Sequence, residues 1–266
     1  MRLTAHRQSF RAMLKQQFQL LTRYPVNLIA NFLLVLVMVI VVTLVVMMFV
    51  PAAAGSTTRG ITLYGFVIFI YLSHTIWTVG LSVQREKIEG TLTGLYLTPA
   101  SRFLSLLSRA VVTLAWTTVA CVGGVLVAQA ITGPLPLYNP GLALIILLFT
   151  VSGLVGLGFA IAGLALHFGE SIELVANILE FSLIGFCAFF FPFAILPRAL
   201  QTVSRLIPLS YSVDAFRTVA LGLDQPELLS LGVELVIITS TGIVAPLLGY
   251  AIYHLNEKKA RQQGVF

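Results

Sequence analysis

Six long stretches of the chain contain no lysine, arginine or aspartate, and this feature limits the possible folds more than any other. Each stretch has 21–25 residues, and only the fifth contains a glutamate, Glu180. A helix needs about 20 apolar residues to cross about 30 Å of hydrocarbon, so each stretch is long enough to span a bilayer. The stretches are residues 28–50, 61–83, 110–131, 142–166, 174–196 and 235–255.

The composition agrees with a membrane protein and excludes two other classes. Of 266 residues, 58% are hydrophobic and 10% are charged, which excludes both a cytosolic globular enzyme and a disordered chain. Segments of about ten residues with alternating polarity, which are typical of membrane β-barrels, are absent from the sequence. Because backbone groups in lipid must be satisfied internally, the sequence predicts an all-α polytopic protein with six transmembrane helices, forming one domain over residues 1–266.

The distribution of positive charge predicts the orientation. Twelve lysines and arginines lie on the side that holds both chain ends, and four lie on the other side. Cytoplasmic loops carry the excess of positive charge, so we expect both termini in the cytoplasm and the protein in the cytoplasmic membrane. This placement beside the spans also accounts for the net charge of +6 without nucleic acid as a partner. The alternative, a signal peptide cleaved after residues 52–54, is disfavoured because the first apolar stretch is too long.

Residues 2–24 have the pattern of an amphipathic helix. Leu3, Phe10 and Leu14 recur at helical spacing, whereas Arg7 and Arg11 fall on the opposite face. This pattern predicts an interfacial helix in the cytoplasmic headgroup layer. The alternative is an ordinary basic flank with no mechanical role.

The most polar internal segment, residues 84–104, lies on the predicted cytoplasmic side. Within it, Gly90 permits a sharp turn and Pro99 breaks a helix. A short, charged helix between turns is suited to being gripped by a soluble partner, and the alternative is a solvated loop. The residues predicted to make this contact are Arg85, Glu86, Lys87, Glu89, Gly90, Thr91 and Leu92.

The segment 197–222, between the fifth and sixth spans, predicts two short helices on the outer side. Pro197 and Pro208 each stand where a helix can start, and Gly222 where one can end. Asp214 and Arg217 are three residues apart, so they could pair. We expect a re-entrant helix pair that dips into the outer leaflet; the alternative is a loop lying on the surface.

Glu180 is the only acidic residue inside a predicted span. With Glu170, Glu173 and Asn177 it forms one polar stripe at the inner end of the fifth span. One hypothesis is that this stripe faces an inward-open cavity or a dimer interface; the other is that Glu173 interacts with the helix dipole and Glu180 is paired structurally. His74, in the second span, is expected to form a hydrogen bond between helices.

The outer half of the fifth span is rich in phenylalanine. Phe189, Phe190 and Phe193 are candidates for an apolar path or gate, although packing and lipid contact are the more common roles of such residues. A metal site at His167 with Glu170 is disfavoured because a fourth ligand is not evident. Small residues recur four apart in the third and fourth spans, which predicts close helix contacts.

Two strings resemble motifs of a known family. The first is Glu86-Lys87-Ile88-Glu89-Gly90-Thr91-Leu92 with Thr98-Pro99 downstream, and the second is Pro208-Leu209-Ser210-Tyr211-Ser212-Val213-Asp214-Ala215-Phe216-Arg217. With the basic amphipathic start and six spans, they resemble the membrane subunit of ABC-2 type (type V) ABC exporters, in particular the drug-resistance and lipid-transport permeases.

The resemblance implies roles for the segments. Residues 2–24 would be the elbow helix, the region around Glu86–Leu97 would hold the coupling helix, and the outer pair would be external gate helices. The gate residues would be Pro208, Tyr211, Asp214, Phe216 and Arg217.

The resemblance also implies an assembly and an activity. A second copy or a paralogue and two ABC ATPase subunits would complete an ATP-driven exporter of amphipathic, drug-like or lipid-like cargo. This chain contains no phosphate-binding loop, so ATP and magnesium would be bound by the ATPase subunits, and the chain would be non-catalytic. The alternatives are export of a lipid-linked glycan, a proton-coupled secondary carrier, and an intramembrane enzyme, for which a catalytic cluster is not evident.

Overall fold

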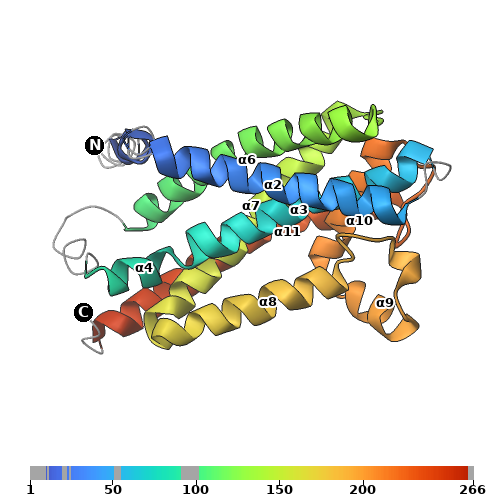
Figure 1. Ribbon diagram of the computed structural model, residues 1–266. Helices are drawn as coiled ribbons and strands as arrows, with labels where there is room; N and C mark the ends of the chain where they lie inside the picture. Colours follow the sequence, from blue (N-terminus) through green and yellow to red (C-terminus); the bar gives the residue numbers. More distant parts are fainter. Residues whose placement is uncertain are drawn as a thin grey trace.

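The computed structural model describes residues 10, 12–19, 23, 25–50, 55–90 and 102–262, and these residues form helices and connecting turns without a β-strand (Figure 1). Much of the predicted N-terminal helix, residues 2–24, lies outside the described residues, although 12–19 are helical. Thr91 and Leu92 of the predicted coupling region also lie outside them. The elements are α2 (Pro25–Phe49), α3 (Gly55–His74), η2 (Thr75–Gly80), α4 (Ser82–Ile88), α6 (Arg102–Thr132), α7 (Pro140–Phe168), η3 (Gly169–Ser171), α8 (Ile172–Phe186), η4 (Phe193–Ile195), α9 (Arg198–Ser204), α10 (Pro208–Leu221) and α11 (Leu231–Gln262).

The helices form an elongated bundle with two distinct ends. Figure 1 shows α4 and the last turns of α11 at one end, which we call the α4 end. The short helices α9 and α10 lie at the other end, which we call the α10 end. The described part of the chain is thus all-helical, as predicted, and has several helices able to cross a membrane.

Five helical stretches within the described residues are long and apolar enough to cross a membrane. The fourth, Pro140–Phe186, contains the fourth predicted span and the first part of the fifth. It is not one straight rod, because α7 ends at Phe168. The next residue, Gly169, has a φ of 55° in the left-handed region, and the chain then turns back into α8. The predicted count of six is therefore not confirmed, although each predicted span overlaps one of these stretches.

The fifth predicted span, 174–196, is helical only in its first part. Helix α8 has 15 residues, about 22 Å of rise, which is less than a bilayer's hydrocarbon thickness. After it, Ala188 has a φ of 49°, and Pro192 cannot donate a helical hydrogen bond. The rest of the predicted span forms a turn and the short η4.

The second predicted span is part of a longer helical run with a wide turn in its middle. Helix α3 passes into the π-helical η2 and then into α4, and we call this run, residues 55–88, helix two. π-helical turns inside α-helices are rare and occur often at functional sites. Here η2 packs against α7, where Gly158 leaves room for Thr75 and Val79.

The most extensive helix pair joins α7 and α11. Small residues of both helices meet along it: Gly156 faces Ala245, Gly249 faces Gly156, and the Ser152 hydroxyl donates to the Gly242 carbonyl at 2.7 Å. This contact confirms that the small residues of the fourth span allow close approach between helices of one chain. In the third span, Gly124 has the same role against Val39 of α2.

The segment predicted to hold two short outer helices does hold two, α9 and α10. Helix α10 begins at Pro208 and ends at Gly222, which adopts the left-handed conformation with a φ of 65°. Every side chain from Ser210 to Leu221 is buried, because α10 packs against α3, α7 and α11. A surface-lying loop is excluded for α10 within this structure, whereas entry into the outer leaflet stays a prediction.

Candidate coupling site

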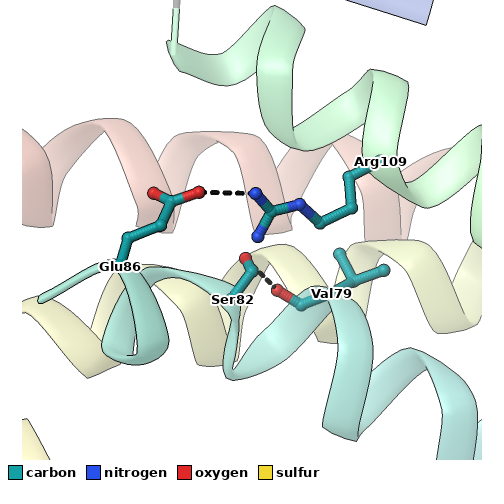
Figure 2. Close-up of polar contacts among 4 residues, drawn as sticks. All are labelled: Val79, Ser82, Glu86 and Arg109. Carbon is teal, nitrogen blue, oxygen red and sulfur yellow. Dashed lines mark hydrogen bonds and ion pairs between the residues drawn. The ribbon is translucent and has the colours of Figure 1, made fainter. Parts of the chain in front are cut away.

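The end of helix two is braced against α6 by an ion pair. The Glu86 Oε1 atom lies 2.6 Å from Arg109 Nη2, and Figure 2 shows the two side chains pointing toward each other from neighbouring helices. Next to this pair, the Ser82 hydroxyl donates to the Val79 carbonyl at 2.7 Å, at the junction of η2 and α4. Both charged side chains are about one-fifth to one-quarter exposed, so the pair positions α4 more than it stabilises the fold.

Beyond this brace, the tip of α4 is exposed. Arg85, Lys87 and Glu89 are exposed, and Ile88 is an exposed apolar side chain at 64%. Gly90 has a φ of 69°, which confirms the sharp turn expected there. The tip thus offers charges around one apolar residue, which is a surface suited to binding a protein partner.

Two hydrogen bonds connect helix two to α8. The Trp77 indole Nε1 donates to Glu180 Oε2 at 2.6 Å, and the Gln84 side-chain amide donates to Glu173 Oε1 at 3.1 Å. Glu180 is 7% exposed, and Trp77 lies in the π-helical segment. A displacement of α4 therefore reaches α8 through two polar contacts as well as through packing.

The polar stripe of α8 is only partly as the sequence predicted. Glu173 and Glu180 point at helix two of the same chain, and the Asn177 amide donates to the Glu173 backbone carbonyl within α8. The structural pairing of Glu180 is thus present, and the role of the stripe in a cavity or a dimer interface stays a prediction. Sequence reasoning missed Trp77 and Gln84, because nothing in their local sequence marks them as partners of α8.

Replacing Trp77 with phenylalanine tests the Trp77–Glu180 contact. The change leaves the buried carboxyl group without its indole donor, so we expect a loss of about 2 kcal/mol in the free energy of unfolding, visible as a lower melting temperature in detergent. The double variant Trp77→Phe with Glu180→Leu removes both partners and is expected to recover most of this loss. A double variant that is less stable than Trp77→Phe alone would contradict the pairing.

Other predicted polar residues have partners elsewhere. His74 Nδ1 lies 2.8 Å from the Thr117 hydroxyl of α6, which confirms the expected hydrogen bond between helices. Among the described residues, no group of three or more His, Cys, Asp and Glu side chains could hold a metal ion. Cys121 and Cys187 are both buried free thiols.

At the α10 end, Asp214 and Arg217 do not form the predicted hydrogen-bonded pair. The Arg217 guanidinium donates to the carbonyls of Ala188, Phe189 and Phe191, at 2.8, 2.6 and 3.2 Å. Asp214 Oδ2 instead accepts from the Leu228 backbone amide at 2.7 Å. The correction has a physical reason: the turn after α8 leaves carbonyls without helical partners, and a buried guanidinium satisfies several of them at once.

Burial shifts the pKa values of both residues in the direction of the neutral form. Burial lowers the pKa of Arg217 to about 10, although Asp214 and Glu227 oppose the shift, so the guanidinium is charged at neutral pH. Burial raises the pKa of Asp214 above its ordinary value, and hydrogen bonds from the backbone at Glu227 and Leu228 counteract this.

The remaining gate candidates make contacts with other residues. Pro208 starts α10, the Tyr211 hydroxyl donates to the Arg205 carbonyl at 2.6 Å, and the Phe216 ring meets Tyr64 of α3 edge to face. The rings of Phe189 and Phe190 each contact the Phe69 ring of α3 in a tilted arrangement.

Phe193 belongs to a second, smaller apolar cluster with Ala188 and Leu196. The three phenylalanines proposed as an apolar path are therefore packed or half-buried inside the chain, and their role as a path stays a prediction.

The comparison with family models gives one result that covers most of the chain. The model described as ABC-2 type transporter matches residues 8–221, which include helix two, α8 and α10. The chain belongs to the ABC-2 type transporter family. This ABC-2 protein is thus a multi-pass membrane protein and the permease component of an ABC transporter, a component that is typically non-catalytic and normally works with an ABC ATPase. The sequence matches none of the curated proteins with which it was compared.

Proposed function

We propose that this permease is the membrane subunit of an ATP-driven exporter that moves amphipathic, drug-like or lipid-like cargo out of the cytoplasm by alternating access. Two ATPase subunits bind ATP and magnesium, and a second copy or a paralogue of this chain completes the transport path. The protein lies in the cell membrane, with both termini and the α4 end facing the cytoplasm, in agreement with the positive charge on that side.

The observation that carries this proposal is the exposed tip of α4 together with its contacts to the bundle. The tip presents Ile88 and three charged residues to a partner, and the Glu86–Arg109 pair fixes its position relative to α6. The bonds to Glu173 and Glu180 extend the same contact to α8. Closure of the ATPase dimer would push on this tip, and the spans would respond because nucleotide binds the two states differently.

A proton-coupled carrier is less well supported by the same contacts. Two ionisable groups inside the spans, His74 and Glu180, each have a hydrogen-bond partner on another helix. Such partners suit a structural role at least as well as a proton relay.

Replacing Ile88 with aspartate tests the proposed coupling surface. An apolar residue at the centre of an interface is worth about 2 kcal/mol or more, so we expect the dissociation constant for the cognate ATPase subunit to rise about 30-fold. The matched control is Ile195→Asp, which makes the same change at an exposed isoleucine (69%) near the α10 end. Binding is measured between the purified permease in nanodiscs and its cognate ABC ATPase subunit; equal losses in both variants would contradict the assignment.

A further inference from the structure

A groove of about 400 Å³ lies between α2, helix two and α6, on a part of the bundle that the coupling contacts use only at Trp77 and Arg85. Its wall combines apolar side chains with polar ones, which is unusual at the level of the membrane spans. None of the contacts described so far explains why polar groups gather there.

Three hydroxyl groups in this groove have no hydrogen-bond partner among the described residues. Ser73, Thr78 and Thr113 line the groove, and their hydroxyls bond to no other described residue. By contrast, Thr75 and Thr117 on the same helices donate to the carbonyls four residues earlier, at 2.7 and 2.9 Å. Since an unpartnered polar group in hydrocarbon is costly, the groove is built to meet polar atoms of another molecule.

The indole of Trp116 lines the same wall. Its Nε1 atom is buried and has no hydrogen-bond partner among the described residues. The polar groups of helix two and α6 therefore form a belt in the middle of the groove.

The two ends of the groove differ in charge and polarity. Among the described residues that line it, Arg85 is the only lysine, arginine, aspartate or glutamate, and its exposed side chain makes no ion pair with another described residue. Phe69 lies sixteen residues earlier on helix two, about 24 Å away along the helix, beside Leu34 and Met38 of α2. The groove thus runs from a cation through hydrogen-bonding groups to an apolar end.

We infer that this groove binds an acidic amphiphile, with its negative head at Arg85, its polar portion against the hydroxyl belt and its tail against Leu34, Met38 and Phe69. The orientation is that of a lipid whose head lies at the α4 end of the bundle. That this ligand is cargo rests on the proposed function, whereas its binding needs neither ATP nor a partner. Trp77 touches both the groove and Glu180, so an occupied groove is in direct contact with the link to α8.

The chain carries its own reporters for this site. It has two tryptophans, Trp77 and Trp116, and both line the groove. The experiment places the purified chain in phosphatidylcholine nanodiscs and adds increasing fractions of phosphatidylglycerol brominated on its acyl chains, which quenches tryptophan fluorescence on contact. We expect quenching that saturates at a low fraction of the anionic lipid, whereas brominated phosphatidylcholine should quench only gradually. Equal curves for the two lipids would overturn the inference.

Two substitutions that each remove one positive charge distinguish binding in the groove from general attraction of the lipid to a basic surface. Arg85→Gln is expected to raise the phosphatidylglycerol fraction at half-maximal quenching about fivefold, which corresponds to about 1 kcal/mol. Lys87→Gln removes the same charge from an exposed residue of α4 that does not line the groove, and it should leave the curve unchanged. Matching shifts in both variants would mean surface attraction alone.

Further arms test the belt and the source of the negative charge. Thr113→Val removes one hydroxyl at nearly constant volume and should weaken the saturable quenching two- to threefold, by analogy with the loss of about 0.5 kcal/mol for a weak hydrogen bond. Inorganic phosphate has the charge without the tail and should not displace the lipid; displacement would identify an anion site and overturn the amphiphile. If the purified permease with its ATPase showed no ATP-driven transport but saturable quenching persisted, the proposed function would be refuted and the lipid-binding inference would stand.

Discussion

Replacing Gly249 with valine is expected to prevent α7 and α11 from packing as they do. A Cβ atom at this position would lie far inside contact distance of the Gly156 carbonyl oxygen, and the opposing atoms are backbone, which cannot rotate away. The helices would have to separate along their most extensive contact. Overpacking typically costs 1–3 kcal/mol and here should reach about 3 kcal/mol or more, because the whole helix must shift.

The measurement is the fraction of monodisperse protein that survives heating in detergent, with membrane insertion measured separately. Insertion should be unaffected, because a single span remains apolar after the change. The matched control is Gly185→Val on α8, where a Cβ would meet nothing within 4 Å. If both valine variants melted at the same temperature, the close approach of the two backbones would not exist.

Replacing Arg217 with methionine is expected to release the turn that follows α8. Its guanidinium holds the carbonyls of Ala188, Phe189 and Phe191, which have no helical donors once α8 ends. Hydrogen bonds to a charged donor contribute about 1.5–3 kcal/mol each, and they are not additive, so we expect a total loss of about 3–5 kcal/mol. Arg217 is 3% exposed, so water cannot replace it without opening the α10 end.

The matched control removes the same charge from the same segment without breaking these bonds. Arg198→Met changes an exposed arginine at the start of α9 and should leave the melting temperature within about a degree. Hydrogen exchange at residues after Phe186 should rise in Arg217→Met and stay unchanged in the control. Unchanged exchange in both variants would show that the turn is held by other contacts.

Several elements could be predicted from the sequence because their causes are local. Apolar stretches predicted helices long enough to cross a membrane, and the start of α10 at Pro208 and its end at Gly222 follow from what those residues do to the backbone. The turn at Gly90 is of the same kind. The pattern of small residues likewise predicted close helix contacts, although it did not identify α11 as the partner of α7.

The end of α8 could not be predicted, because its cause is distant in sequence. Residues 174–196 are apolar almost throughout, so hydropathy extends the helix past the point at which it ends. The turn depends on Arg217, about thirty residues later, and on Gly65 of α3, where a Cβ would collide with the same guanidinium and with the Phe189 carbonyl. The expected pairing of Asp214 with Arg217 failed for the same reason, since each has a better partner in another segment.

The wide turn in helix two has a mechanical consequence for the proposed coupling. A straight α-helix transmits rotation from end to end. In η2, by contrast, each hydrogen bond joins residues five apart, one residue more than in the α-helices on either side. Conversion of that turn to α geometry would swing the following residues by about 100° around the axis, the angle between successive residues in an α-helix. The stretch from Ser82 to Ile88 would thereby rotate about the helix axis at η2. Helix α3 would keep its position, because it packs against α10.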